Sequence, residues 1–554
     1  YVAAGAFLLL YLLVALQRIA YPWELEWMEG GLVDHVQRIV NGQGIYVSPS
    51  LDFIPYAYAP LYAYLSAGVA QLIGVGFVAP RLVSLAASLA ACGLIFLWVR
   101  RETGRASAGL IAAALFAAMY RLAGTWFDIA RCDSLFLALL LASLYLLRFG
   151  RSLATALCAG LLGLLAFLAK QAALPILVPL LALACLTDRR RGLPAAMLFV
   201  AGLLASSWIF DALTDGWYGY YVFDLPRQRW LATPRIGKLI GFWSADLIGA
   251  LSLTASAAVL YLLRVVHEWD RGSLRGDAPA RAAFYWLFTA AMIGAAWISR
   301  AESGGHANVL LPAFAALAVL GGLGFHTAAC LLEPPTPDQI QPPDQTRSPH
   351  QAQSPGTTAR TAGFERQWID LALSCAILLQ FAVLAYNPRW IIPTAEDRRT
   401  GEECVAALAG LPGEVWMPYH GHLPSLAGKS MRAHLMAIAD IMASTGVVKS
   451  RLRAEIAGAL EEHRFQAIVL DEDLWFFEDE LEQSYGLKQP FLPDSPGFYP
   501  LAGMRVRPRW LYETPSATPE ESFAAGSAAD HAARLANRAS IASRRRSNSL
   551  PSEL

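Results

Sequence analysis

Charged residues are scarce in this chain. Of its 554 residues only 16% are Asp, Glu, Lys or Arg, whereas 55% are hydrophobic. The mean hydropathy of +0.39 is far above that of a soluble domain of this length. The composition therefore excludes a soluble globular protein and predicts an integral membrane protein. The 44 basic and 44 acidic residues balance, so net charge indicates no particular partner.

Motifs for common cofactors are also missing. The sequence has neither a P-loop nor a dinucleotide fingerprint, and its lack of a basic, aromatic surface predicts no nucleic-acid partner. Its seven cysteines show no CxxC or Cys/His spacing, so we expect no structural zinc and no disulfide framework. His420, His422 and His434 with Asp440 match no zinc pattern either. We assign no metal site and no cofactor, and the sequence leaves a divalent-cation requirement open.

What the chain has instead is long apolar runs. Segments close to 20 apolar residues predict about eleven membrane-spanning helices, the first of them uncleaved. Arginine clusters fall on alternate connections, which places those connections in the cytoplasm and the first loop outside. If residues 59–76 also crossed the membrane, every later arginine cluster would lie outside. This segment is therefore predicted to be interfacial or re-entrant. The predicted spans are 2–20, 78–99, 107–123, 132–148, 153–169, 172–187, 193–213, 238–263, 281–299, 307–331 and 368–386.

These features predict an all-α membrane protein, a polytopic bundle with interfacial first-loop helices, followed by a small extracytoplasmic α/β domain. Low-complexity composition marks the connecting and terminal segments as disordered. The predicted parts are a transmembrane catalytic bundle at 1–331, a cytoplasmic Pro/Gln-rich linker at 332–367, a last spanning helix at 368–386, the α/β domain at 387–515 and a tail at 516–554.

The first loop is acidic. Glu24, Glu26 and Glu29 directly follow the first apolar segment. Carboxylates close to a bilayer are costly, which makes them candidates for function, although an ordinary hydrated loop is the alternative reading. Other polar residues are predicted on the same outer face. A carboxylate can accept a proton from a hydroxyl and a cation can hold a phosphate, so this face suits group transfer from a lipid-phosphate carrier.

The order of several short motifs resembles the bacterial C-type (GT-C) glycosyltransferases, which include protein O-mannosyltransferases, aminoarabinose transferases of lipid A and core-polysaccharide transferases. The resemblance covers about residues 1–330. It rests on Glu26-Trp-Met-Glu29-Gly30, Asn41-Gly-Gln-Gly44-Ile-Tyr46, Tyr58-Ala-Pro60-Leu61-Tyr62, Arg81-Leu-Val-Ser, Ala130-Arg131-Cys-Asp133, Leu168-Ala-Lys170-Gln171 and Gly304-Gly305-His-Ala-Asn308.

This resemblance implies an inverting transferase that moves a sugar from a polyprenyl phosphate to a hydroxyl on a lipid, glycan or protein acceptor. Its active site would face the periplasm or exterior of the plasma (inner) membrane. The family carries an Asp-Glu pair in this loop. Here Met28 replaces the Asp, so Glu29 is the direct match for the catalytic base and Glu26 is its helper or substitute.

The remaining site residues follow from the same resemblance and from their predicted place on the outer face. Lys170 is expected to contact the donor phosphate, although it could instead snorkel to the interface. Asp133 could bind a sugar hydroxyl, cap its helix or pair with Arg131. A polytopic transporter or lipid-linked sugar flippase is the alternative function. The predicted substrate-binding residues are Lys170, Gln171, Asp128, Arg131, Asp133, Tyr58, Arg81, Arg300 and Asn308.

Overall fold

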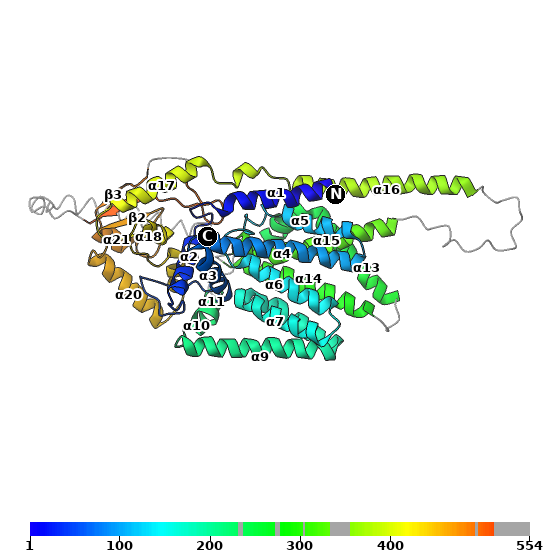
Figure 1. The fold of residues 1–554 in the computed structure, drawn as a ribbon, viewed down its shortest axis with the longest axis horizontal. Helices are drawn as coiled ribbons and strands as arrows, with labels where there is room; N and C mark the ends of the chain where they lie inside the picture. The colour runs from blue at the N-terminus through cyan, green and yellow to red at the C-terminus, as the bar shows by residue number, and fades with distance from the viewer. Residues whose placement is uncertain (231–235, 272–276, 303–304, 333–354, 493–496, 515–554) are drawn as a thin grey trace, which may run out of the picture.

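The protein is a helical bundle with a smaller α/β region at one end (Figure 1). The computed structural model describes all residues except 231–235, 272–276, 303–304, 333–354, 493–496 and 515–554. The main helices of the bundle run along the long axis of the molecule. They are α1 (Val2–Ile19), α4 (Val78–Thr103), α5 (Ala106–Ala118), α6 (Asp133–Phe149), α7 (Leu153–Ala169), α8 (Leu174–Thr187), α9 (Arg189–Leu213), α13 (Ala250–Arg271), α14 (Asp277–Ala301), α15 (Leu311–Leu332) and α16 (Pro355–Val383).

Apolar length makes this a multi-pass membrane protein. Within the described residues, seven helical stretches are long and apolar enough to cross a membrane. A helix lies at each of the predicted spans. Three details differ from the prediction. Four of the eleven predicted spans, at 107–123, 132–148, 153–169 and 172–187, fall on the shorter helices α5, α6, α7 and α8, which are not among these seven stretches. α5 ends at Ala118 and turns follow it, and the span predicted at 238–263 is built from three consecutive pieces: α12 (Ile236–Gly241), a π-helical segment (Phe242–Gly249) and α13.

Helix α15 is the centre of the bundle. Most of its residues are buried, which fits its apolar sequence on all faces. It packs closely on α13 because small residues let the backbones approach. A Cβ atom on Gly324 would lie 1.8 Å from the backbone oxygen of Ala257, and one on Gly321 would lie 2.6 Å from the Thr254 side chain. The Gly-Gly-Leu-Gly run of α15 thus sets this helix spacing.

The α/β region contains a four-stranded sheet in the order β1-β2-β4-β3. β1 and β2 are parallel, and β4 pairs antiparallel with β2 and with β3. The apolar strand β2 is buried along its whole length, as expected for an inner strand. The strands are β1 (Val415–Trp416), β2 (Ala467–Leu470), β3 (Leu487–Pro490) and β4 (Trp510–Glu513), and the accompanying helices are α17 (Ala395–Gly410), α18 (Leu423–Leu426), α19 (Leu435–Met442), α20 (Val447–Glu461) and α21 (Glu478–Ser484).

The predicted linker needs a correction at its end. α16 begins at Pro355, inside the segment 332–367 that composition predicts to be disordered. Residues 333–354 of that segment lie outside the described residues, as does the predicted tail from residue 516. The apolar part of α16 lies beside α1, where the rings of Phe7 and Phe381 stack with centroids 5.1 Å apart. This contact fixes the last long helix to the bundle.

The first loop lies between the bundle and the α/β region (Figure 1). It contains α2 (Glu29–Val40) and the short apolar α3 (Leu61–Ile73), and the α10 (Trp217–Gly219) and α11 (Leu225–Trp230) segments lie near the same end. The backbone N–H groups of Leu501 and Ala502 both donate to the carbonyl of Leu25 at 2.9 Å. The α/β region therefore holds the acidic part of this loop directly.

Candidate functional site

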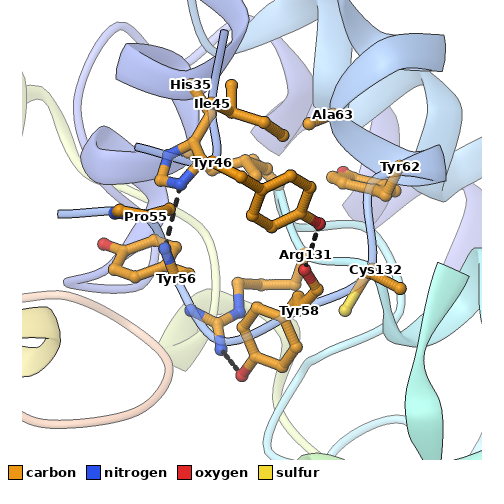
Figure 2. Close-up of a pocket in the computed structure, with 13 residues that line it drawn as sticks. His35, Ile45, Tyr46, Pro55, Tyr56, Tyr58, Tyr62, Ala63, Arg131 and Cys132 are labelled. Atoms are coloured by element: carbon orange, nitrogen blue, oxygen red, sulfur yellow. Dashed lines mark hydrogen bonds between the residues drawn. The ribbon is translucent and has the colours of Figure 1, made fainter. Parts of the chain in front are cut away.

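A tyrosine-rich pocket opens at this end of the bundle (Figure 2). It has a volume of about 440 Å³ when its open mouth is included. The first loop supplies most of its wall, and the segment that leads into α6 supplies the rest. Its lining residues are Leu32, His35, Ile45, Tyr46, Pro55, Tyr56, Tyr58, Ala59, Tyr62, Ala63, Ala130, Arg131 and Cys132.

Arg131 gives this pocket a positive wall. Its Nη2 donates to the hydroxyl oxygen of Tyr58 at 2.8 Å, as Figure 2 shows. The guanidinium also lies over the rings of Tyr58 and Tyr56, at 5.4 Å and 6.0 Å from their centroids. Tyr46 donates its hydroxyl to the carbonyl of Tyr58 at 2.7 Å, which fixes the loop that carries Tyr58. Arg131 is thus held by aromatic faces and stays charged.

Lys170 lies on the other side of Tyr58. It follows the last residue of α7, and its Nζ is 5.9 Å from the centroid of the Tyr58 ring. The Lys170 ammonium pairs with Oδ1 of Asp133 at 2.5 Å, and Asn308 donates to the same oxygen at 3.1 Å. Burial opposes the charged form of Lys170, but Asp133 outweighs it and raises the lysine pKa. The structure therefore brings together three residues that the sequence analysis selected separately.

Glu29 is completely enclosed. Its two carboxylate oxygens accept hydrogen bonds from Arg81, from Nε at 3.0 Å and from Nη2 at 2.5 Å. The backbone N–H groups of Leu25 and Ala130 donate to the same carboxylate at 2.6 Å and 2.5 Å. Burial opposes its ionisation, but Arg81 and these hydrogen bonds outweigh burial and lower the Glu29 pKa. Glu29 thus ties the first loop to α4 and to the segment before α6.

Arg81 is equally engaged. Its remaining N–H groups donate to the carbonyls of Tyr21 and Trp23 at 2.5 Å and 2.6 Å, and a longer bond of 3.5 Å reaches the carbonyl of Arg18. The side chain is fully buried. These contacts leave Arg81 no exposed face for a phosphate, which argues against the substrate-binding role given to it from sequence.

Glu26 has a different environment from Glu29. One of its oxygens, Oε2, lies 3.4 Å from Nη1 of Arg131 and accepts from the backbone N–H of Met28 at 3.3 Å. Burial raises the pKa of Glu26 to about 8, because Arg131 offsets only part of the desolvation. The two carboxylates of one short loop therefore have pKa values pushed in opposite directions, which is a common arrangement where one of them exchanges protons.

Three further predicted residues serve internal contacts. Asp128 pairs with Arg18 at 3.1 Å, and Tyr120 donates to it at 2.6 Å. The Gln171 amide donates to the carbonyls of Ala57 and Val222 at 3.0 Å and 3.1 Å, joining the first loop to the 217–224 segment. Arg300 pairs with Asp246 at 2.9 Å. Their substrate-binding roles stay predictions.

Sequence reasoning missed how histidines lock the first loop to the α/β region. His420 contacts Glu24 through Nδ1 and Asp471 through Nε2, the latter at 2.8 Å. His422 contacts Asp34 of α2 at 2.7 Å. No local pattern could reveal the pairs of His420 with Glu24 and of His422 with Asp34, because 396 and 388 residues separate the partners. The described residues hold no cluster of three or more His, Cys, Asp or Glu side chains suited to a metal ion.

Comparison with known proteins shows a similar family over part of the chain and a similar fold over most of it. Residues 57–210 match the family described as dolichyl-phosphate-mannose-protein mannosyltransferase. ArnT from Cupriavidus metallidurans bound to undecaprenyl phosphate is 12% identical, with a TM-score of 0.53 over 93% of this chain and 98% of ArnT. Apo ArnT gives 13% identity and the same TM-score over 92% and 97%. No curated protein sequence matches significantly. The chain therefore shares the fold of ArnT, and residues 57–210 resemble the mannosyltransferase family, in line with the resemblance that the sequence motifs indicate.

Proposed function

We propose that this protein is a membrane glycosyltransferase that moves a sugar from a polyprenyl-phosphate donor to an acceptor hydroxyl, with inversion at the anomeric carbon. One observation carries the proposal. The ring of Tyr58 lies beside two cations, Arg131 and Lys170, at the wall of a pocket, and the carboxylate of Glu26 lies on Arg131. This arrangement supplies the charges that a phosphate leaving group and a hydroxyl nucleophile require.

The cations are assigned to the donor phosphate. Breaking the bond between the anomeric carbon and the phosphate oxygen leaves the electron pair on the phosphate, so negative charge grows there during transfer. Arg131 and Lys170 are held in place before the reaction, by Tyr58 and by Asp133 respectively. Fixed cations of this kind stabilise a developing charge without reorganisation at the moment of reaction.

Glu26 is assigned as the general base. It would accept the proton of the acceptor hydroxyl while the oxygen forms its new bond to the anomeric carbon, and a single displacement of this kind inverts that carbon. A pKa of about 8 lies near the working pH, where a general base is most effective. Glu29, the direct match to the family motif, is assigned to holding the loop through Arg81.

The donor class has support from the comparisons. The similar ArnT structure is described as bound to undecaprenyl phosphate, a polyprenyl phosphate. Because the likeness between the chains is one of fold, the donor is part of our proposal for this protein. We also propose that the pocket faces the outside of the plasma membrane, since the arginine-rich connections lie at alternate loops.

The proposal is tested with full-length protein in liposomes that contain polyprenyl phosphate carrying a radiolabelled sugar. Addition of an extract of cell-envelope acceptors should give label covalently attached to the acceptor, and free polyprenyl phosphate should appear in equal amount. Analysis of the product linkage by NMR should give the opposite anomeric configuration from the donor. Movement of intact labelled lipid across the bilayer without transfer would favour the flippase and would overturn the proposal.

A further inference from the structure

A second groove lies away from the tyrosine-rich pocket. It has a volume of about 780 Å³ with its open mouth included, and it is formed where residues 389–397, after the last long helix, meet residues 497–505. Arg389 and Trp390 form part of one wall, and Tyr499 and Arg505 form part of the other. Nothing in the proposed sugar transfer uses these four side chains.

The carboxylates of this groove are already engaged. Asp397 accepts from the backbone N–H groups of Thr394 and Phe498, at 2.7 Å and 2.6 Å. Glu396 pairs with Arg399 at 2.5 Å. The acidic side chains are therefore committed to capping α17, to fixing the opposite wall and to a local ion pair.

The arginines have free hydrogen-bonding capacity. Arg389 and Arg505 are both exposed, and within the described ranges neither side chain pairs with a carboxylate. Arg505 lies over the ring of Tyr499, 5.0 Å from its centroid. A third arginine, Arg121, lies over Trp390 at 5.0 Å. Two guanidinium groups thus line a groove edged by two aromatic rings, and a third lies against one of these rings.

The groove also lies at the end of a membrane span. The apolar stretch that is long enough to cross a bilayer runs from Gln367 to Trp390, and Trp390 remains 63% exposed. Trp and Tyr concentrate at the headgroup level of membranes, and arginine binds phosphate through two parallel hydrogen bonds. The place of the groove at the end of a span and its arginine and aromatic side chains therefore both favour a phosphate-bearing headgroup as its ligand.

We propose that this groove binds the phosphate-bearing headgroup of an anionic membrane phospholipid, with Arg389 and Arg505 contacting the phosphate and Trp390 and Tyr499 lying along the glycerol region. The inference concerns lipid binding alone and does not depend on the proposed sugar transfer. A free phosphate ion offers the same charge, so the test must separate the two sources.

The test uses full-length protein in detergent and follows binding of short-chain phosphatidylglycerol, phosphatidylcholine and inorganic phosphate. Wild type should prefer phosphatidylglycerol over phosphatidylcholine, and inorganic phosphate should compete weakly. The double variant Arg389→Gln/Arg505→Gln should weaken phosphatidylglycerol binding about tenfold or more, since two charge-assisted contacts are lost. The matched control, Lys449→Gln/Arg453→Gln on α20, also removes two positive charges, outside the groove.

Three results would overturn the inference. Equal affinity for phosphatidylglycerol and phosphatidylcholine would mean that the anionic headgroup is not recognised. Equal weakening in the α20 control would mean that general charge attraction explains binding. Complete competition by inorganic phosphate at concentrations similar to those of the lipid would assign the arginines to a free anion. Thermal denaturation of each variant shows that altered binding is measured on folded protein.

Discussion

The carboxylate of Glu29 and the guanidinium of Arg81 form a two-point ion pair in which both side chains are fully buried. The pair joins the first loop to α4, and two backbone N–H groups complete the shell of the carboxylate. Glu29 therefore serves to hold the loop in which Glu26 lies. This division of roles between neighbouring carboxylates leads to the first prediction.

Glu29→Gln should destabilise the protein, because the buried Arg81 would lose its charged partner. Breaking a buried pair by changing one member typically costs about 3–5 kcal/mol. The free energy of unfolding, measured by denaturant titration in detergent, should fall by an amount of this order. Glu403→Gln is the control, since Glu403 is half exposed and its contact with Arg399 spans 3.7 Å on the surface of α17. Equal stabilities of the two variants would refute the structural role of Glu29.

Lys170→Gln should weaken use of the polyprenyl-phosphate donor. Loss of one charge-assisted contact should cost about 1.5–3 kcal/mol, seen as a higher KM for the donor or a lower kcat/KM. Lys429→Gln is the control, because Lys429 donates to the Leu411 carbonyl in the α/β region. If folded Lys170→Gln kept wild-type donor kinetics, the lysine would have only its structural contact with Asp133.

The His420 contact predicts a pH dependence of stability. Burial opposes the charged form of His420, but Asp471 and Glu24 outweigh it and raise the histidine pKa to about 10. The pKa of His420 is higher in the folded protein than the value near 6.5 in the unfolded chain, so the protonated histidine stabilises the folded state. This stabilisation is fully present below pH 6.5 and is lost as the pH rises through about 10. The melting temperature in detergent should therefore fall from pH 7 to pH 10.

His420→Gln should reduce this dependence on pH, whereas His463→Gln should retain it. His463 belongs to the same region, but its ring hydrogen-bonds to the backbone carbonyl of Ser484 and, among the described residues, not to a carboxylate. A wild-type melting temperature that stays constant between pH 7 and 10 would contradict the charged state assigned to His420, independently of how either variant folds.

Membrane orientation can be tested by labelling. The first loop and the α/β region contact one another, so they must lie on the same side of the bilayer. The arginine pattern predicts that this side is outside and that the 332–367 segment is inside. An impermeant thiol reagent should modify Ser450→Cys in intact cells and leave Ser348→Cys unmodified. Labelling of Ser348→Cys without labelling of Ser450→Cys would show that the protein has the opposite orientation in the membrane.

Much of the bundle could be predicted from sequence, because apolar length is a local signal. The predicted spans coincide with helices, apart from shifted ends such as that of α5. The helical start of α16 was missed, because the polar composition around Pro355 resembles a linker. Composition reports the average preference of a segment and does not give the residue at which a helix begins.

The site could be predicted only as a set of residue types. The motifs selected Arg131, Lys170, Asp133 and Asn308, and the structure brings them to one place. Their partners could not be predicted, because pairs such as Glu29 with Arg81 depend on how distant segments pack. The sequence resemblance favours Glu29 as the base, whereas the complete hydrogen bonding of the Glu29 carboxylate, which only the structure shows, is the reason that we propose Glu26 instead.

The most direct test of the account is single-turnover sugar transfer by Glu26→Gln. The amide retains the shape of the side chain but cannot accept the hydroxyl proton, so the rate should fall about 10²–10⁴-fold while donor binding and the melting temperature remain close to wild type. The wild-type rate should rise with pH through about 8, where Glu26 loses its proton, and this rise should be absent from the variant. A near-normal rate in folded Glu26→Gln, with the same pH profile as wild type, would contradict the assignment of Glu26 as the catalytic base.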